Sequence, residues 1–223
     1  MPGLGRDFAA VVFDLDGVLL ESEQLWSLAK RRLSLERGGR WTAAAEQDML
    51  GMSSPEWSRY MREELGLEME PGEISTAVAE LLETMYRERL PLLAGADAAV
   101  RSLAERYPLG LASSSNRATI DLVLELAGWM DRFTTTVSSE EVAAGKPAPD
   151  VYVEASRRLA LAPGECVAIE DSEVGIRAAR AAGLAVVAIP NRSYRPRADV
   201  LSSADLVLAS ITELPGALGA APG

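Results

Sequence analysis

Two aspartates close an apolar run near the start of the chain. Asp14 and Asp16 are two residues apart, and Gly17 follows them directly. Side chains alternate along a strand, so residues at i and i+2 are expected on the same side. Two buried like charges cost several kcal/mol unless something neutralises them. The pair therefore predicts a divalent cation site, where Gly17 permits a tight turn or the close approach of a ligand.

Three other apolar runs also end in groups that could do chemistry. Ser113 and Ser114 follow one run and offer hydroxyl and N–H groups to an anion. Lys146 stands in a stiff Gly-Lys-Pro-Ala-Pro-Asp loop, and Glu170 and Asp171 end another run. Taken singly, each of these groups could have a role other than binding: a serine or Asp171 could cap a helix, and the lysine could simply be solvated. Together they predict one edge that holds a metal and binds an anion.

The apolar runs that precede these groups predict a sheet. Expected strands are 9–15, 109–113, 134–137, 166–169, 185–189 and 206–208. Between most of them lie segments of helical period, including 118–126, 150–161 and 173–182, with Gly183 as a helix stop. This alternation predicts an α/β fold with a parallel, doubly wound sheet.

One interval contains no convincing strand. From residue 21 to residue 90 only helical patterns occur, at 25–35, 43–50, 55–65 and 73–89. This stretch follows the first strand, so we expect a separate small bundle that roofs the carboxyl ends of the strands, where ligands bind in open α/β sheets.

The composition limits both chemistry and partners. The 223 residues carry 22 basic and 33 acidic side chains, a net charge of −11, which argues against nucleic-acid or membrane binding. Cys166 is the only cysteine, and neither an export signal nor a spanning segment is indicated, so we expect a soluble, cytoplasmic protein. The chain has no histidine, which leaves carboxylates and lysine for acid-base chemistry.

The four motifs, in order, resemble those of the haloacid dehalogenase superfamily. They are Asp14-Leu-Asp-Gly-Val, Leu111-Ala-Ser, Gly145-Lys-Pro-Ala-Pro-Asp and Glu170-Asp-Ser-Glu-Val-Gly-Ile. They look most like the branch of β-phosphoglucomutases and sugar-phosphate phosphatases. The resemblance implies a Rossmann-like core, residues 1–20 and 91–223, with an inserted helical cap, residues 21–90. It also implies Mg²⁺-dependent phosphoryl transfer through an aspartyl phosphate.

The resemblance also implies roles for the acidic residues. Asp14 would be the nucleophile, and Asp16 would protonate the leaving alkoxide and then take a proton from the attacking water. Mg²⁺ would bind the Asp14 carboxylate, the Asp16 backbone carbonyl and Asp171, with Glu170 near or in its coordination shell.

Three polar residues would bind the phosphate. Lys146 would balance the charge on Asp14 and the phosphoryl group, while the Ser113 hydroxyl and the Ser114 N–H would hold the remaining oxygens. The aspartate at position 16 argues against dehalogenase and phosphonatase chemistry, because members with those activities lack it.

The cap departs from the mutase pattern of this branch. Trp26 stands where a mutase has a histidine, and Ser54 stands where it has an arginine. Without that arginine a mutase would lose its intermediate to water, so a hydrolase is favoured. Trp26, Met52, Ser54 and Trp57 are candidates for contact with the substrate, although large residues at helical spacing also form bundle cores.

The leading hypothesis is a Mg²⁺-dependent phosphatase for a small phosphorylated metabolite, such as a sugar phosphate or a similar monoester. The alternatives are a mutase of the β-phosphoglucomutase type and a catalytically silent binding protein on the same fold. We expect a monomer or a weak homodimer.

Overall fold

The computed structural model describes residues 4, 7–49, 52, 54–191 and 195–219. The chain divides into two compact units, Met1–Glu21 with Pro91–Gly223, and Ser22–Leu90. The sequence placed these boundaries after residues 20 and 90. We call the first unit the core and the second the cap.

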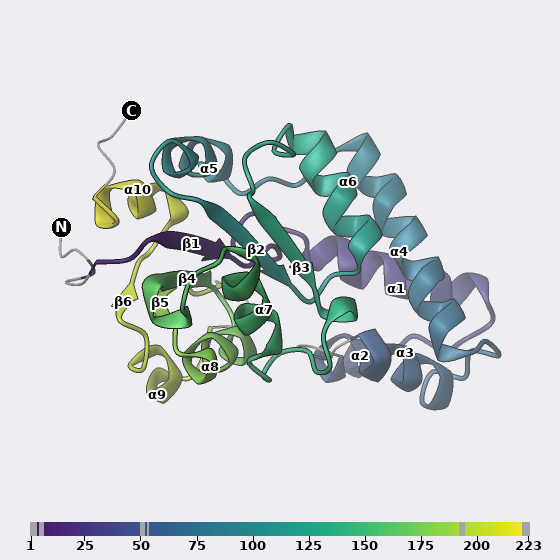
Figure 1. Cartoon of the computed structure of the whole chain (residues 1–223). Coiled ribbons are helices and arrows are strands. Elements are labelled where there is room, and N and C mark those ends of the chain that lie inside the picture. The colour runs from purple at the N-terminus through teal and green to yellow at the C-terminus, as the bar shows by residue number, and fades with distance from the viewer. Residues whose placement is uncertain (1–3, 5–6, 50–51, 53, 192–194, 220–223) are drawn as a thin grey trace. The chain divides into compact units, whose positions relative to one another are not determined.

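The core is built on a parallel sheet with strand order β3-β2-β1-β4-β5-β6, labelled in Figure 1. The strands are β1 (Ala10–Phe13), β2 (Leu109–Ser113), β3 (Thr135–Ser138), β4 (Cys166–Glu170), β5 (Ala185–Ala188) and β6 (Leu206–Val207). At the centre, Val12 pairs with Gly110 on one side and with Ala168 on the other. The predicted parallel α/β sheet is therefore confirmed.

Helices cover both faces of this sheet. They are α5 (Ala96–Ala104), α6 (Arg117–Ala127), α7 (Asp150–Arg158), α8 (Glu173–Ala182), α9 (Ala198–Leu201) and α10 (Leu214–Ala217). In Figure 1, α7, α8 and α9 lie on one side of the strands, and α5, α6 and α10 on the other. One buried cluster joins strand residues Val12, Ala112, Ala168 and Val186 to helix residues Tyr152, Ile176 and Val200. Burial on both faces explains why the strands read as continuous apolar runs.

Polar side chains begin two of the core helices. Asn116 caps α6 by accepting the N–H of Thr119, and Ser172 caps α8 by accepting the N–H of Gly175. The alternative that Asp171 caps α8 is therefore wrong, because Ser172 does so. The predicted stop of α8 is confirmed, since Gly183 ends the helix with a φ of +90°.

The cap contains helices and no strand among its described residues. Its helices are α1 (Glu23–Glu36), α2 (Ala43–Asp48), α3 (Ser54–Glu63) and α4 (Pro71–Glu88). Their apolar sides form a separate core that includes Leu33, Met61, Ile74 and Val78. The helical character predicted for this insertion is confirmed, and both ends of each helix lie within about one helical turn of the predicted positions.

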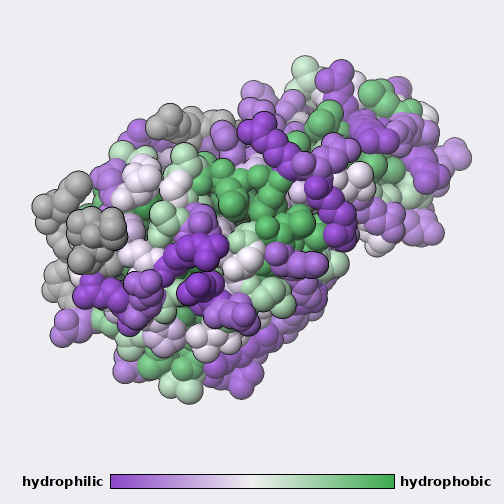
Figure 2. Space-filling view, turned by 90° about the horizontal axis from the view of Figure 1, so that it is seen from above, coloured by the Kyte–Doolittle hydropathy of each residue, from purple (hydrophilic) through white to green (hydrophobic). Residues whose placement is uncertain are grey.

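Hydrophilic residues cover much of the face drawn in Figure 2, and hydrophobic residues gather between them. Within the described residues, no helix is long and apolar enough to cross a membrane. Cys166 is a buried free thiol in β4.

Candidate active site

Asp14 is the first residue after β1, at the centre of the sheet. Its N–H donates to the carbonyl of Ile169 in β4 at 3.0 Å, which ties the chain to the sheet just beyond the strand. The strand ends at Phe13 rather than at residue 15, so strand alternation does not orient the two aspartates. A turn does so instead, in which the N–H of Gly17 donates to the carbonyl of Leu20.

Gly17 also makes room for a second carboxylate. It has a φ of +81°, and a Cβ at this position would lie 1.9 Å from Oδ2 of Asp171. No side chain fits in that space, and the conformation itself favours glycine. The turn after β1 can therefore lie directly against the aspartate that follows β4.

Three buried carboxylates meet where β1 and β4 end. One oxygen each from Asp14, Glu170 and Asp171 lie within 4.8 Å of one another. Lys146, from the loop before α7, places its Nζ 2.8 Å from Oδ1 of Asp14 and 2.6 Å from Oε1 of Glu170. The lysine side chain is only 3% exposed. The sequence-predicted residues Asp14, Lys146, Glu170 and Asp171 are thus side by side.

Burial and mutual repulsion disfavour the charges in this cluster. Burial raises the pKa of Asp14 to about 7, although the neighbouring ammonium of Lys146 opposes that shift. Burial, followed by repulsion from Glu170 and Asp14, raises the pKa of Asp171 well above its ordinary value. For Lys146, burial acts to lower the pKa, but Asp14 and Glu170 raise it, so the lysine stays charged. One lysine is not enough to neutralise three carboxylates.

The donor set fits Mg²⁺. All three groups of the cluster are carboxylates, the oxygen ligands that hard divalent cations prefer, and among them Asp14 and Asp171 have oxygens to offer; the described residues add no nitrogen or sulfur ligand to the cluster. An added divalent cation would also remove the repulsion that raises the pKa values of Asp14 and Asp171.

Glu170 is more heavily hydrogen-bonded than the sequence indicates. Its Oε1 accepts both the ammonium of Lys146 and the hydroxyl of Tyr152, each at 2.6 Å. Its Oε2 accepts the N–H of Asp171 at 3.1 Å and the hydroxyl of Ser172 at 3.1 Å. A carboxylate has about four lone-pair sites, so these donors already fill it. Glu170 therefore holds the lysine and the start of α8 in place.

The remaining predicted core residues form a second group beside the cluster. The Ser113 hydroxyl oxygen accepts the N–H of Ser115 at 3.0 Å, and the hydroxyl of Ser115 donates to Oδ2 of Asp16 at 2.7 Å. Ser114 is exposed, and its carbonyl accepts the hydroxyl of Ser139. The carboxylate of Asp16 is not one of the three that form the acidic cluster. The two aspartates of the first motif therefore have different surroundings.

Sequence reasoning assigned no role to four supporting residues. Ser115 stands in the serine run after β2 and Gly175 in the fourth motif, so the sequence marked both positions without showing what they do. Tyr152 reads as a core position of a helix and Asn191 as a loop residue, so nothing local marks these two. In the structure Asn191 donates to Oδ2 of Asp171 at 3.3 Å.

The candidate substrate residues of the cap lie in or against its own core. Trp57 is 3% exposed, and Trp26 and Met52 are half-buried against the same cluster. Trp26 and Trp57 meet edge to face with ring centroids 6.3 Å apart. Ser54 is the first residue of α3, where its carbonyl accepts the hydroxyl of Ser58. These contacts support the bundle-core alternative for the two tryptophans, and substrate contact stays a prediction.

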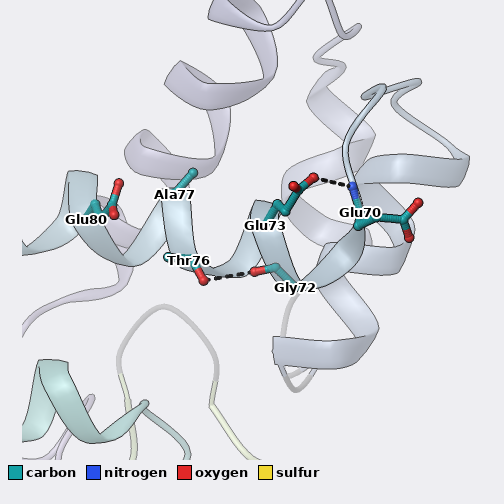
Figure 3. A pocket seen from close by; sticks show the side chains of 6 residues that line it. All are labelled: Glu70, Gly72, Glu73, Thr76, Ala77 and Glu80. Carbon is teal, nitrogen blue, oxygen red and sulfur yellow. Dashed lines mark hydrogen bonds between the residues drawn. The ribbon is translucent and has the colours of Figure 1, made fainter.

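A pocket on the cap offers no second phosphate site. It is lined by residues of α4 and of the turn before it, namely Glu70, Gly72, Glu73, Thr76, Ala77 and Glu80. Figure 3 shows the carboxylate of Glu73 turned to the N–H of Glu70, and the hydroxyl of Thr76 turned to the carbonyl of Gly72. Because its charged side chains are glutamates, this pocket repels a phosphate.

The fold and the site together define an α/β enzyme whose reactive groups lie at the carboxyl edge of a parallel sheet. The chain belongs to the haloacid dehalogenase-like hydrolases, because the sequence model of that family matches residues 8–183. This confirms the resemblance carried by the four motifs.

Several known proteins are similar to this chain. A bifunctional riboflavin kinase/FMN phosphatase of Arabidopsis thaliana is 31% identical over 208 residues, 92% of this chain but only 54% of that protein. Hexitol phosphatase B of Escherichia coli is 31% identical over 223 residues, covering 94% of this chain and 95% of that one. The crystal structure of CbbY from Rhodobacter sphaeroides in complex with phosphate has 26% identity and a TM-score of 0.83, covering 93% and 96% of the two chains.

Proposed function

We propose that this protein is a Mg²⁺-dependent phosphatase that hydrolyses a small phosphorylated metabolite through a phosphoryl group carried on Asp14. The observation that carries this proposal is the contact between the Asp14 carboxylate and the Lys146 ammonium at 2.8 Å, beside two further carboxylates. The names of the relatives, among them a hexitol phosphatase and an FMN phosphatase, support a sugar phosphate or a similar monoester as the substrate.

Mg²⁺, when bound, and the ammonium of Lys146 would offset the negative charge of the substrate. Asp14 and Asp171 would hold Mg²⁺ together with the backbone carbonyl of Asp16, while Glu170 supports the site through Lys146. When bound, the metal supplies positive charge that stabilises the phosphoryl oxygens during transfer. Lys146 supplies a fixed charge already in contact with the nucleophile. Ser113 and Ser114 would donate hydrogen bonds to the remaining oxygens.

The reaction then has two steps. First, an oxygen of Asp14 forms a bond to phosphorus as the bond from phosphorus to the ester oxygen breaks, and Asp16 gives its proton to the departing alkoxide. Second, the Asp16 carboxylate takes a proton from water, the water oxygen bonds to phosphorus, and the bond to Asp14 breaks. The products are an alcohol and inorganic phosphate, and both aspartates return to their starting states.

Substitution of the nucleophile tests the proposal. Asp14→Asn should abolish phosphate release from an aryl phosphate, and a chelator should abolish it in the unaltered enzyme until Mg²⁺ is restored. Turnover that survives both treatments would overturn the proposal. A panel of phosphorylated metabolites, assayed for free phosphate, would then identify the substrate class.

Product analysis separates a phosphatase from the alternatives. A sugar 1-phosphate supplied with catalytic bisphosphate should give free phosphate, whereas a mutase would give the 6-phosphate. No turnover across the panel with Mg²⁺ present would favour a silent binding protein. We also propose that the protein is cytoplasmic, which cell fractionation tests. We propose that it is a monomer or a weak homodimer, which sedimentation of the purified chain tests.

A further inference from the structure

Ser115 connects the loop after β2 to the second aspartate of the first motif. Ser115 is only 3% exposed, and its hydroxyl donates to Oδ2 of Asp16 at 2.7 Å. The two residues are 99 positions apart in the chain, so only the fold brings them together. A buried hydroxyl that donates to a carboxylate fixes the orientation of that carboxylate.

The backbone of Ser115 is itself held at both ends. Its N–H donates to the hydroxyl oxygen of Ser113 at 3.0 Å, and its carbonyl accepts the hydroxyl of Ser138 at 2.7 Å. Ser113 and Ser138 are the last residues of β2 and β3, they are fully buried, and they pair with each other in the sheet. The direction of the Ser115 hydroxyl is therefore set by two neighbouring strands rather than by a flexible loop.

We infer that Ser115 is a positioning residue that holds the carboxyl group of Asp16 for proton transfer. The inference rests on the proposed phosphatase reaction, in which Asp16 protonates the departing alkoxide. A carboxyl group that serves this purpose must stay out of the metal site, and the Asp16 carboxylate is not part of the acidic cluster. The serine hydroxyl can donate to one oxygen of Asp16 whether the other oxygen carries a proton or not.

The same residue also couples proton transfer to phosphate binding. The Ser113 oxygen accepts the Ser115 N–H, so the hydroxyl proton of Ser113 must point away from that N–H. Within the described residues this proton has no acceptor, so the Ser113 hydroxyl is available to donate to a phosphoryl oxygen. One loop thus orients both a donor to the phosphate and the proton shuttle.

The leaving group reveals whether Asp16 is correctly held. An alkyl phosphate releases a basic alkoxide that needs a proton, whereas p-nitrophenyl phosphate releases a stable phenolate that does not. Since kcat/KM reports the steps up to transfer onto Asp14, Ser115→Ala should lower it for an alkyl phosphate by about tenfold or more and leave it nearly unchanged for the aryl ester. The kcat for the aryl ester should still fall, because Asp16 must also activate water in the second step.

Controls separate positioning from loss of structure. Ser156→Ala removes another fully buried serine hydroxyl, which donates to the carbonyl of Tyr152, and should leave the ratio of the two kcat/KM values unchanged. Ser115→Cys keeps the shape of the side chain with a somewhat larger atom in place of the oxygen, but its thiol donates weakly, so it should show the same selective loss even if Ser115→Ala does not fold.

Equal losses of kcat/KM for both esters, or no loss for either, would overturn the role of Ser115. If the unaltered enzyme releases phosphate from neither ester in the presence of Mg²⁺, the phosphatase proposal itself is wrong and this inference is overturned with it. The unaltered enzyme, assayed first, distinguishes the two results.

Discussion

The α-carbon of Gly175 faces the carboxylate of Glu170 so closely that a Cβ at this position would lie 1.8 Å from Oε1. Gly175 is in the first turn of α8, and its N–H donates to the capping hydroxyl of Ser172. The glycine lets the helix begin directly against the buried carboxylate. Any side chain here would push Glu170 away from Lys146 and Tyr152.

Gly175→Ala should therefore destabilise the protein and lower its activity. Helix propensity alone favours alanine over glycine by about 1 kcal/mol, but forcing atoms into a filled space costs about 1–3 kcal/mol or more. Thermal unfolding and kcat measure the two effects. Gly72→Ala, at a position in α4 where a Cβ meets nothing within 4 Å, should be neutral or stabilising. An unchanged Tm in Gly175→Ala would contradict the close contact.

Tyr152→Phe should reduce kcat while leaving the fold intact. The substitution removes the hydroxyl that donates to Glu170 at 2.6 Å but keeps the ring, whose centroid lies 5.0 Å from Nζ of Lys146. Loss of one donor to a buried carboxylate costs about 1–3 kcal/mol, so we expect a moderate fall in Tm and in kcat. Tyr107→Phe removes a hydroxyl that donates to the carbonyl of Leu218 and should leave kcat unchanged. Equal kcat values for the two variants would exclude a role for the Tyr152 hydroxyl.

Lys146→Met should abolish activity and lower the stability of the protein. It leaves Asp14 and Glu170 buried without the cation that both contact. Removing one partner of a buried ion pair typically costs about 3–5 kcal/mol. Denaturant unfolding at neutral pH measures this change. As a control, Arg32→Met breaks an ion pair with Glu36 whose side chains are both about half exposed, and it should change stability little. Similar midpoints for the two variants would contradict the expected burial of the Lys146 contacts.

The stability of the metal-free protein should fall as the pH rises from about 5 to about 8. The pKa of Asp14 is about 7 in the folded protein against an ordinary value of 3.8, so in this window the folded state binds more protons than the unfolded state. The free energy of unfolding then decreases with pH, and the raised pKa of Asp171 acts in the same direction. Tm measured with a chelator across this range checks the slope.

Asp14→Asn and Mg²⁺ should each reduce this slope. The variant removes the titrating group, and the metal favours the deprotonated carboxylates, so its stabilising effect should be larger at the higher pH. A slope in Asp14→Asn as steep as in the unaltered protein would show that Asp14 does not carry the effect.

Much of the fold could be predicted from local patterns. Each of the six expected strands is present, because short apolar runs between helical segments have few other ways to be buried in an α/β protein. Helix α5 (Ala96–Ala104) was not predicted, although its buried residues Ala96, Ala99, Val100 and Leu103 recur at helical spacing. The end of β1 was placed two residues too late, because apolar Leu15 continues the run although the chain already turns there.

The sequence by itself determined which groups lie at the ends of β1, β2 and β4, because those residues stand directly after apolar runs in the chain. Only the tertiary structure decided how these groups divide the work. Asp14 contacts Lys146 and lies in a cluster with Asp171, whereas Asp16 accepts a hydrogen bond from Ser115. Glu170 is surrounded by hydrogen-bond donors. The contacts of Asp14 with Lys146 and of Asp16 with Ser115 join residues 132 and 99 positions apart, and Glu170 contacts Lys146 and Tyr152 across 24 and 18 positions. These distances depend on how the strands and helices pack, which no local pattern encodes.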